Sequence, residues 1–171
     1  RFGVVGVVGV YSMARRASCR GGEEVRLKNY TDIDDETIRA IVRFVKPSDV
    51  SKFDLSIKNC KYSGRGRAYT QGCSYHDTAD PLVIVSIGSA DKFPVVWRDR
   101  SGGYLPMEFY NRTEALVAIV AHELRHLWQA KHKRGWRVWG ARGQFSERDA
   151  DAYALRMLRA WRRGERDEVK A

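Results

Sequence analysis

Apolar residues recur along the chain at two spacings, one typical of helices and one typical of strands. A helical spacing begins at Asp34 or Asp35 and ends at Pro47, which cannot continue a helix. Its apolar side consists of Ile38, Ile41, Val42 and Val45. The stretch 63–72 is polar and contains glycine, which is typical of a loop. Strands are predicted at the alternating or β-branched runs 53–57, 68–69, 82–87 and 93–97.

A long helix follows. Asn111, with Glu114 three residues later, has the form of a capping box in which asparagine replaces serine or threonine. We expect the helix to run from about Thr113 to about Lys133 and to end at Gly135. Its apolar residues cover most of its circumference: Leu116, Val117, Ile119, Val120, Leu124, Leu127 and Trp128. A helix that is apolar on nearly all sides is expected to be buried.

The last predicted helix begins at Ser146, with Asp149 completing a weaker cap, and runs to about Arg163. Its apolar stripe is formed by Ala150, Tyr153, Ala154, Met157, Leu158 and Trp161. Residues 164–171 are interpreted as a charged, frayed tail. A helix, several strands and two further helices predict an α+β domain.

The 171 residues are enough for one domain, which we place at 30–163. The run 2–10 is apolar and rich in glycine but too short to span a bilayer. It is either the end of a signal sequence, an added leader or an edge strand. We therefore treat 1–29 as an N-terminal arm outside the fold.

The formal net charge of +10 favours polyanions as partners. A solvated basic surface is the simpler interpretation, and nucleic-acid binding through that surface is the alternative; no membrane partner is expected. The three cysteines (Cys19, Cys60 and Cys73) are odd in number and lack metal-ligand spacing. This indicates a reducing, cytoplasmic location, with a Cys60–Cys73 bridge as the less favoured alternative.

The chemistry of the chain centres on His122, Glu123 and His126 in the long helix. Histidines four residues apart differ by only about 40° around a helix, so both rings project from one face and can bind one zinc ion. Glu123 lies about 100° from His122, beside the metal, where a general base belongs. The alternative is an ordinary polar patch, but the flanking residues are almost all apolar, and burying such a patch would be costly.

Zinc needs a third protein ligand, and His132 is one candidate. It follows His126 by six residues, the spacing of the third histidine in the metzincin pattern. However, Gln129 stands where that pattern has a glycine that breaks the helix. If the helix continues, His132 lies too far along the axis to reach the metal, so we interpret it as a surface histidine.

Glu147 is the preferred third ligand, because it continues the apolar side of the last helix, and Asp151 lies about 40° away from it. Buried carboxylates need a cation or a hydrogen-bond donor. We expect Asp151 to accept the free ring N–H of a liganding histidine. The alternative is a buried salt bridge, for instance to Arg125. Asp149 and the arginines on the opposite side of this helix are expected to be solvated.

The run His122-Glu123-Leu124-Arg125-His126, followed by Glu147-Arg148-Asp149-Ala150-Asp151, resembles the gluzincin type of zincin metallopeptidase. The resemblance covers about 110–162. It implies a small mixed or antiparallel sheet beside a central HExxH helix, a C-terminal ligand helix and a substrate extended along the edge strand. It also implies one zinc ion per chain, held by His122, His126 and Glu147. A weaker similarity is to SprT-like proteases, which act on DNA-attached proteins and have a further histidine downstream that this chain lacks.

The expected function is hydrolysis of a protein or peptide substrate, with Glu123 as general base. His76, Tyr153 and Arg125 are the candidate donors to the oxyanion. The alternatives are a non-catalytic, zinc-stabilised basic domain that binds nucleic acid, or an SprT-like protease that acts on nucleic-acid-bound proteins. Glu123 separates the first alternative from an enzyme, since a structural site needs no base.

Overall fold

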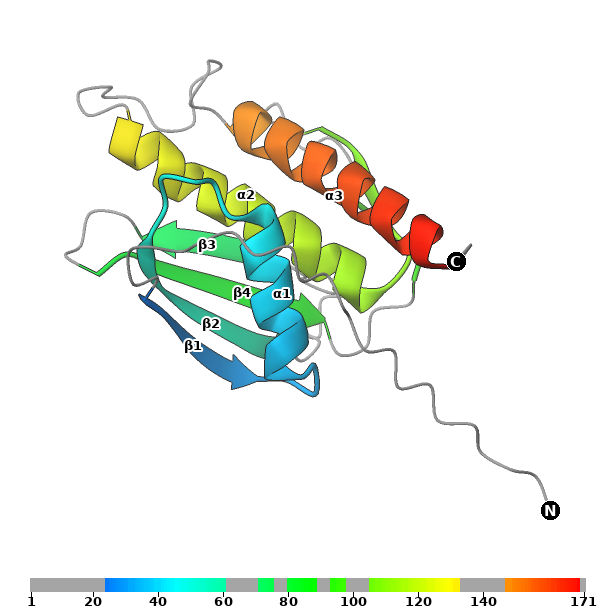
Figure 1. Cartoon of the computed structure of the whole chain (residues 1–171), viewed down its shortest axis with the longest axis horizontal. Coiled ribbons are helices and arrows are strands. Elements are labelled where there is room, and N and C mark those ends of the chain that lie inside the picture. The colour runs from blue at the N-terminus through cyan, green and yellow to red at the C-terminus, as the bar shows by residue number, and fades with distance from the viewer. Residues whose placement is uncertain are drawn as a thin grey trace, which may run out of the picture.

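The computed structural model of the chain describes residues 24–60, 71–75, 80–88, 93–97, 105–132 and 147–169 (Figure 1). These residues form six strands and three helices. In chain order they are β1 (Glu24–Tyr30), α1 (Asp35–Val45), β2 (Lys52–Cys60), β3 (Gln71–Tyr75), β4 (Leu82–Gly88), β5 (Val95–Trp97), β6 (Met107–Phe109), α2 (Arg112–His132) and α3 (Glu147–Val169). The chain is therefore α+β, as the sequence predicts.

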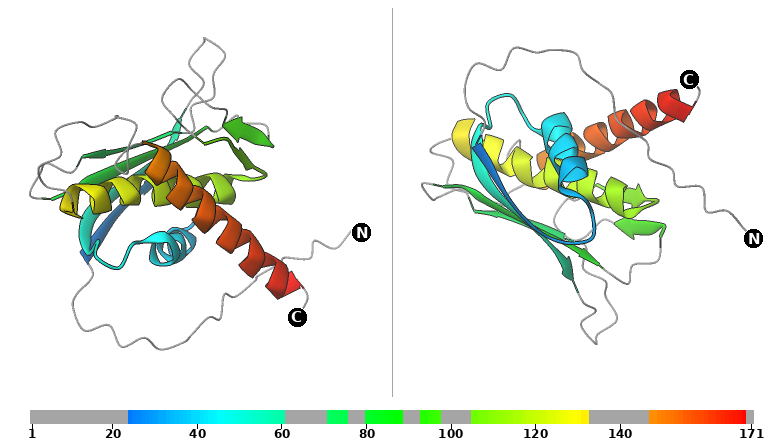
Figure 2. Two further views of the ribbon diagram at one scale, coloured as in Figure 1. Left: turned by 90° about the horizontal axis from the view of Figure 1, so that it is seen from above. Right: turned by 60° about the horizontal axis from the view of Figure 1, so that its bottom comes forward.

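The main sheet has the strand order β1-β2-β4-β3 and is mixed. β1, β2 and β4 are parallel, whereas β3 runs antiparallel to β4 and forms one edge of the sheet. The three helices lie on one face of this sheet, as Figures 1 and 2 show. β5 and β6 form a separate antiparallel pair.

Side-chain alternation decides which face of the sheet the helices cover. Every second residue of β2 and β4 is buried against them: Phe53, Leu55, Ile57, Val83, Val85 and Ile87. The alternation at 53–57 and the β-branched run at 82–87 are thus confirmed as strands, and 93–97 contains β5.

Local capping explains where α1 begins. The Asp34 carboxylate accepts a hydrogen bond from the Thr37 amide at 2.8 Å, and the helix ends directly before Lys46 and Pro47. Its buried residues are the predicted ones: Ile38, Ile41, Val42 and Val45. This amphipathic helix connects the parallel strands β1 and β2.

α2 is the central helix and contacts β3, β4, α1 and α3. Its N-terminal cap differs from the predicted capping box in one of the two hydrogen bonds. The Asn111 side chain accepts from the Glu114 amide at 2.8 Å, but the Glu114 carboxylate accepts from the amide of Tyr110 instead of that of Asn111. Arg162 of α3 also binds this carboxylate, at 2.6 Å, and so holds the two helices together.

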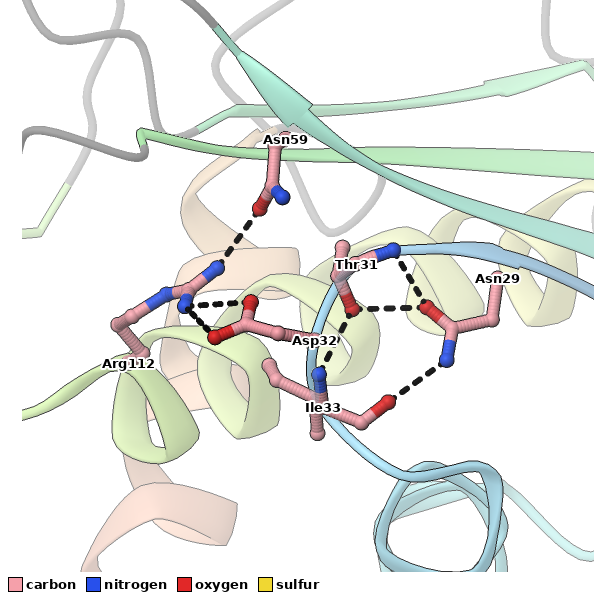
Figure 3. A network of polar contacts seen from close by, with 6 residues as sticks. All are labelled: Asn29, Thr31, Asp32, Ile33, Asn59 and Arg112. Atoms are coloured by element: carbon pink, nitrogen blue, oxygen red, sulfur yellow. Dashed lines mark hydrogen bonds and ion pairs between the residues drawn. The ribbon is translucent and has the colours of Figure 1, made fainter.

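Arg112, the first residue of α2, fastens the helix to the chain between β1 and α1 (Figure 3). One of its terminal nitrogens lies 2.8 and 3.0 Å from the two Asp32 oxygens, and the other donates to Asn59 at 2.7 Å. Asn29 accepts hydrogen bonds from the amide and the hydroxyl of Thr31 and so orders the same turn. These contacts set the position of α2 relative to the parallel strands.

Several boundaries differ from the sequence prediction. β1 begins at Glu24, so part of the segment 1–29 that was treated as an arm belongs to the sheet. α3 continues through Gly164 to Val169, where a frayed tail was expected. β3 and β6 were not predicted. Several predicted features lie outside the described residues: the strand at 68–69, the helix stop at Gly135 and the cap at Ser146.

The predicted alternative of a Cys60–Cys73 bridge is wrong, because neither of these two cysteines forms a disulfide. Cys60 lies opposite Gly88 of β4 and Cys73 lies opposite Ile84. The two are therefore about 13 Å apart along the strand direction, too far for a disulfide. Among the described helices, none combines the length and the apolar character that crossing a bilayer requires.

Candidate metal centre

Three side chains converge where the middle of α2 meets the start of α3. His122 and His126 lie one helical turn apart and their Nε2 atoms are 3.0 Å from each other. Glu147, the first residue of α3, places Oε2 3.0 Å from His122 Nε2 and 3.4 Å from His126 Nε2. His122 and His126 are buried and Glu147 is partly exposed, and together these three residues could hold a metal ion. The structure thus brings together the predicted ligand set.

The spacing of the three atoms suits one metal ion. In a tetrahedral zinc site with bonds of about 2.0–2.1 Å, neighbouring ligand atoms lie about 3.3 Å apart. The observed separations of 3.0–3.4 Å are close to this value. Two imidazole nitrogens and a carboxylate oxygen are also ligand types that zinc accepts. The residues present therefore fit a zinc ion with one further coordination position.

Asp151 orients the first histidine. It is fully buried, and its Oδ1 lies 2.9 Å from Nδ1 of His122. Its other oxygen accepts the Leu105 amide at 2.7 Å. Because a carboxylate only accepts, Nδ1 is the donor to Asp151, and Nε2 is the ring nitrogen that faces the cluster. Asp151 thus makes the contact that the sequence predicts for it.

Gln129 orients the second histidine, and sequence reasoning did not identify it. Its Oε1 lies 2.9 Å from Nδ1 of His126, and its Nε2 donates to Asp149 at 2.9 Å. Arg125 binds the same carboxylate through two nitrogens, at 2.7 and 3.2 Å. Asp149 therefore accepts hydrogen bonds from two residues of α2, which corrects the expectation that it is solvated. The available signal was the spacing of Gln129, three residues after His126.

Glu123 lies beside the cluster but outside the ligand group. It is 5% exposed and packs against the edge strand β3. A Cβ atom placed on Gly72 would lie 2.5 Å from its Oε1, so β3 passes directly over this carboxyl group. Burial raises the pKa of Glu123, while the positive charge that His122 and His126 can carry and a hydrogen bond with Ser74 act in the opposite direction.

The electrostatics of the cluster favour a cation. Burial alone lowers the pKa of His122, but hydrogen bonds to Asp151 and Glu147 outweigh it and raise this pKa to about 10. Contacts with His122 and His126 hold the pKa of Glu147 well below its ordinary range. The carboxylates thus favour positive charge at the point where the three ligand atoms meet. A divalent ion would supply that charge.

No protein-family model matches the chain, and neither a curated protein nor a solved structure matches it. The chemistry of the site is therefore inferred from its own residues and their geometry.

Two of the three predicted oxyanion donors, Tyr153 and Arg125, make hydrogen bonds to other groups. The Tyr153 hydroxyl donates to the Val45 carbonyl at 2.7 Å. Arg125 pairs with Asp149, as described above, and its guanidinium lies 3.8 Å from the ring centre of Trp128. The third, His76, lies outside the described residues.

His132 does not belong to the cluster. It is more than one-third exposed, and its Nε2 lies 3.0 Å from an Asp49 carboxylate oxygen. α2 runs without a break to His132, so this ring is carried away from the ligand atoms, as the uninterrupted helical pattern predicts. The alternative role for Glu147 and Asp151 was a buried salt bridge to Arg125. This alternative is wrong, because Arg125 pairs with Asp149, whereas Glu147 and Asp151 contact His122.

Proposed function

We propose that this chain is a zinc-dependent peptidase in which His122, His126 and Glu147 hold one zinc ion and Glu123 is the general base. The observation that carries the proposal is the pairing of a three-ligand cluster with a buried carboxylate that is not one of the ligands. The resemblance of the two motifs to gluzincins supports the same assignment. A catalytic zinc site has three protein ligands and one open position, which is the arrangement proposed here.

Bound zinc would supply Lewis acidity for the attacked carbonyl and for the water that attacks it. Glu123 would take the proton from that water and deliver it to the leaving amine. Because burial raises the pKa of Glu123, its carboxylate holds a proton more readily than an exposed glutamate does. Asp151 and Gln129 accept hydrogen bonds from the Nδ1 atoms, so the Nε2 atoms are the ring nitrogens that would bind the ion.

The position of β3 supports a peptide as the substrate. β3 is an edge strand, so one side of its backbone has no strand partner within the described sheet. Its residue Gly72 lies against Glu123. An extended peptide that adds to this edge would form main-chain hydrogen bonds there and would bring a carbonyl group close to the base.

A purely structural zinc site is the main alternative. Structural sites use four protein ligands and have no use for a base beside the metal. The described residues contribute three ligands. Burying the Glu123 carboxylate beside them costs free energy, and that cost is easiest to explain if the carboxylate takes part in the reaction.

The test compares the purified protein with Glu123→Gln at equal zinc occupancy, with casein and a mixed peptide library as substrates. The proposal predicts one zinc ion per chain in both proteins and cleavage only by the unmodified protein. Glutamine preserves the size of the side chain but cannot accept the proton, so this pair isolates the base. Equal cleavage by both proteins, or zinc binding without any cleavage, would contradict the peptidase assignment.

A second proposal concerns the partner, and it rests on a row of arginines along α3. Four exposed arginines fall within a sector about 80° wide and extend over about 22 Å: Arg148, Arg156, Arg159 and Arg163. Glu147, at the start of the same helix, is the proposed ligand. A nucleic acid along this row would bring a bound protein close to the site, as the weaker SprT-like resemblance suggests.

This second proposal is tested with a labelled single-stranded oligonucleotide at several salt concentrations. Arg159→Gln/Arg163→Gln should weaken binding several-fold and reduce the slope of log K against log salt by about 1–2. Lys28→Gln/Lys58→Gln, on the opposite face of the sheet, removes the same charge and is the matched control. Equal losses in both double variants would attribute binding to net charge and not to the row.

A further inference from the structure

We propose that Gln129 is a positioning residue of the metal centre, and that Asp149 fixes the orientation in which its amide acts. This inference rests on the proposed zinc site and adds a part to it. Gln129 would hold the ring of His126 so that Nε2 presents its lone pair to the metal. Asp149 would prevent the amide from turning its NH₂ group toward the histidine.

The burial of Gln129 shows that its amide must be fully paired. The residue is 1% exposed, so neither end of the amide can rely on solvent. Its Nε2 lies 2.9 Å from an Asp149 oxygen and its Oε1 lies 2.9 Å from Nδ1 of His126. A carboxylate can only accept, so the NH₂ group must face Asp149 and the carbonyl oxygen must face the histidine. Nδ1 of His126 is therefore the donor.

The orientation of Asp149 is itself fixed by α2. Arg125 donates a hydrogen bond to each oxygen of Asp149. Its guanidinium also lies over the Trp128 ring, which limits the movement of the Arg125 side chain. The chain of contacts thus runs from Arg125 to Asp149, then to Gln129 and finally to His126. Three of these residues belong to α2 and only Asp149 belongs to α3. The contact that orients the histidine therefore also fixes α3 on α2.

This connection has a consequence for the third ligand. Glu147 lies two residues before Asp149, at the first position of α3. A helix start can shift more easily than a helix centre, because the first turn lacks part of its hydrogen bonding. By holding Asp149 against α2, Gln129 and Arg125 hold Glu147 within 3.0–3.4 Å of the two histidine nitrogens.

The two histidines are supported differently. His122 has the fully buried carboxylate Asp151 behind it, whereas His126 has the neutral amide of Gln129. A glutamate at 129 would still accept from His126 but would repel Asp149. A methionine would keep the length of the side chain and lose both hydrogen bonds. These two substitutions separate the orientation of His126 from the contact between the helices.

The experiment measures the zinc affinity of the full chain by competition with a chromophoric chelator, for the unmodified protein, Gln129→Met and Gln129→Glu. The visible spectrum of the cobalt-loaded proteins and the thermal unfolding of the metal-free proteins are recorded in parallel. Gln129→Met should weaken zinc binding about 10- to 100-fold and change the cobalt spectrum. Gln129→Glu should bind zinc within about threefold of the unmodified protein, because Arg125 still holds Asp149, and with it Glu147, against α2. Its metal-free form should unfold at a lower temperature.

Each outcome decides the inference. If Gln129→Met binds zinc as tightly as the unmodified protein, Gln129 does not position His126. If Gln129→Glu is as weak as Gln129→Met or weaker, the residue acts only by joining the helices, and the positioning role is refuted. If the unmodified protein binds no zinc, the proposed function fails first, which distinguishes that result from the other two.

Discussion

Replacing Gly72 with alanine would place a methyl group where the Glu123 carboxyl group now lies. The added Cβ would stand 2.5 Å from Oε1, 2.6 Å from Cγ and 2.8 Å from Cδ of Glu123. Ordinary contacts between such atoms are about 3.5 Å, so the side chain of Glu123 must move by about 1 Å. Since Gly72 does not have a positive φ angle, alanine fits the backbone there.

The size of the effect follows from the role of the base. A displacement of about 1 Å in a catalytic group can cost about 100-fold in rate, or about 2.7 kcal/mol of transition-state stabilisation. The backbone should change little, because the three atoms that must yield all belong to the side chain of Glu123. Alanine in place of glycine favours a strand by about 0.5–1 kcal/mol, which offsets part of the cost of displacing Glu123.

The assay combines three measurements on Gly72→Ala: zinc content, free energy of unfolding and the rate of peptide hydrolysis. We expect unchanged zinc content, a change in unfolding free energy below about 1 kcal/mol, and a rate reduced about 100-fold. Gly164→Ala is the matched control, since no atom lies within 4 Å of an added Cβ there. It should stabilise α3 by up to about 1 kcal/mol and leave the rate unchanged.

A Gly72→Ala protein that keeps both full activity and its zinc would refute the role assigned to Glu123 or its position under β3. Loss of zinc together with activity would show instead that β3 supports the ligands and not the base.

Three further substitutions test other contacts. Asp151→Asn should weaken zinc binding about 10- to 100-fold in a chelator competition, because the amide supports His122 less well; unchanged affinity would contradict this role. Burial raises the pKa of Glu114, but hydrogen bonds from Arg162 and the main chain outweigh it and hold this pKa below 4.5. The stabilisation by Glu114 is therefore complete above pH 4.5 and is lost as pH falls through the lowered pKa, so Glu114→Gln should cost about 2 kcal/mol in urea unfolding at pH 7 and less at acid pH. A loss that does not depend on pH would contradict the ion pair. Tyr153→Phe should cost about 1 kcal/mol of stability and leave hydrolysis unchanged, whereas a large fall in rate would restore it as an oxyanion donor.

The sequence predicted the elements whose patterns are strong. α1 and α2 have clear caps and apolar spacing, and β2 and β4 alternate or are β-branched, so local physics determines them. β3 was missed because its residues, Gln71 to Tyr75, have little strand propensity. It is a strand because it pairs with β4, a long-range contact that no local pattern contains.

In the candidate site, too, local patterns predicted one part and long-range packing decided the other. The helical spacing of His122 and His126, and the apolar side of α3, predicted which residues converge. Helix geometry gives directions around one axis only, so it placed Asp149 on the solvent side of α3. How α3 packs on α2 decides that Asp149 instead meets Arg125 and Gln129. The spacing of Gln129, three residues after His126, places both side chains on one side of α2, but the contact of Gln129 with Asp149 depends on how α3 packs and could not be found from the sequence.

The most direct test of the metal centre is anomalous diffraction at the zinc edge from crystals grown with one equivalent of zinc. The proposal predicts a single peak about 2 Å from Nε2 of His122, Nε2 of His126 and Oε2 of Glu147, with Glu123 beside it and not bound. A peak at another place, or coordination by Glu123 that closes the fourth position, would contradict the catalytic centre proposed here.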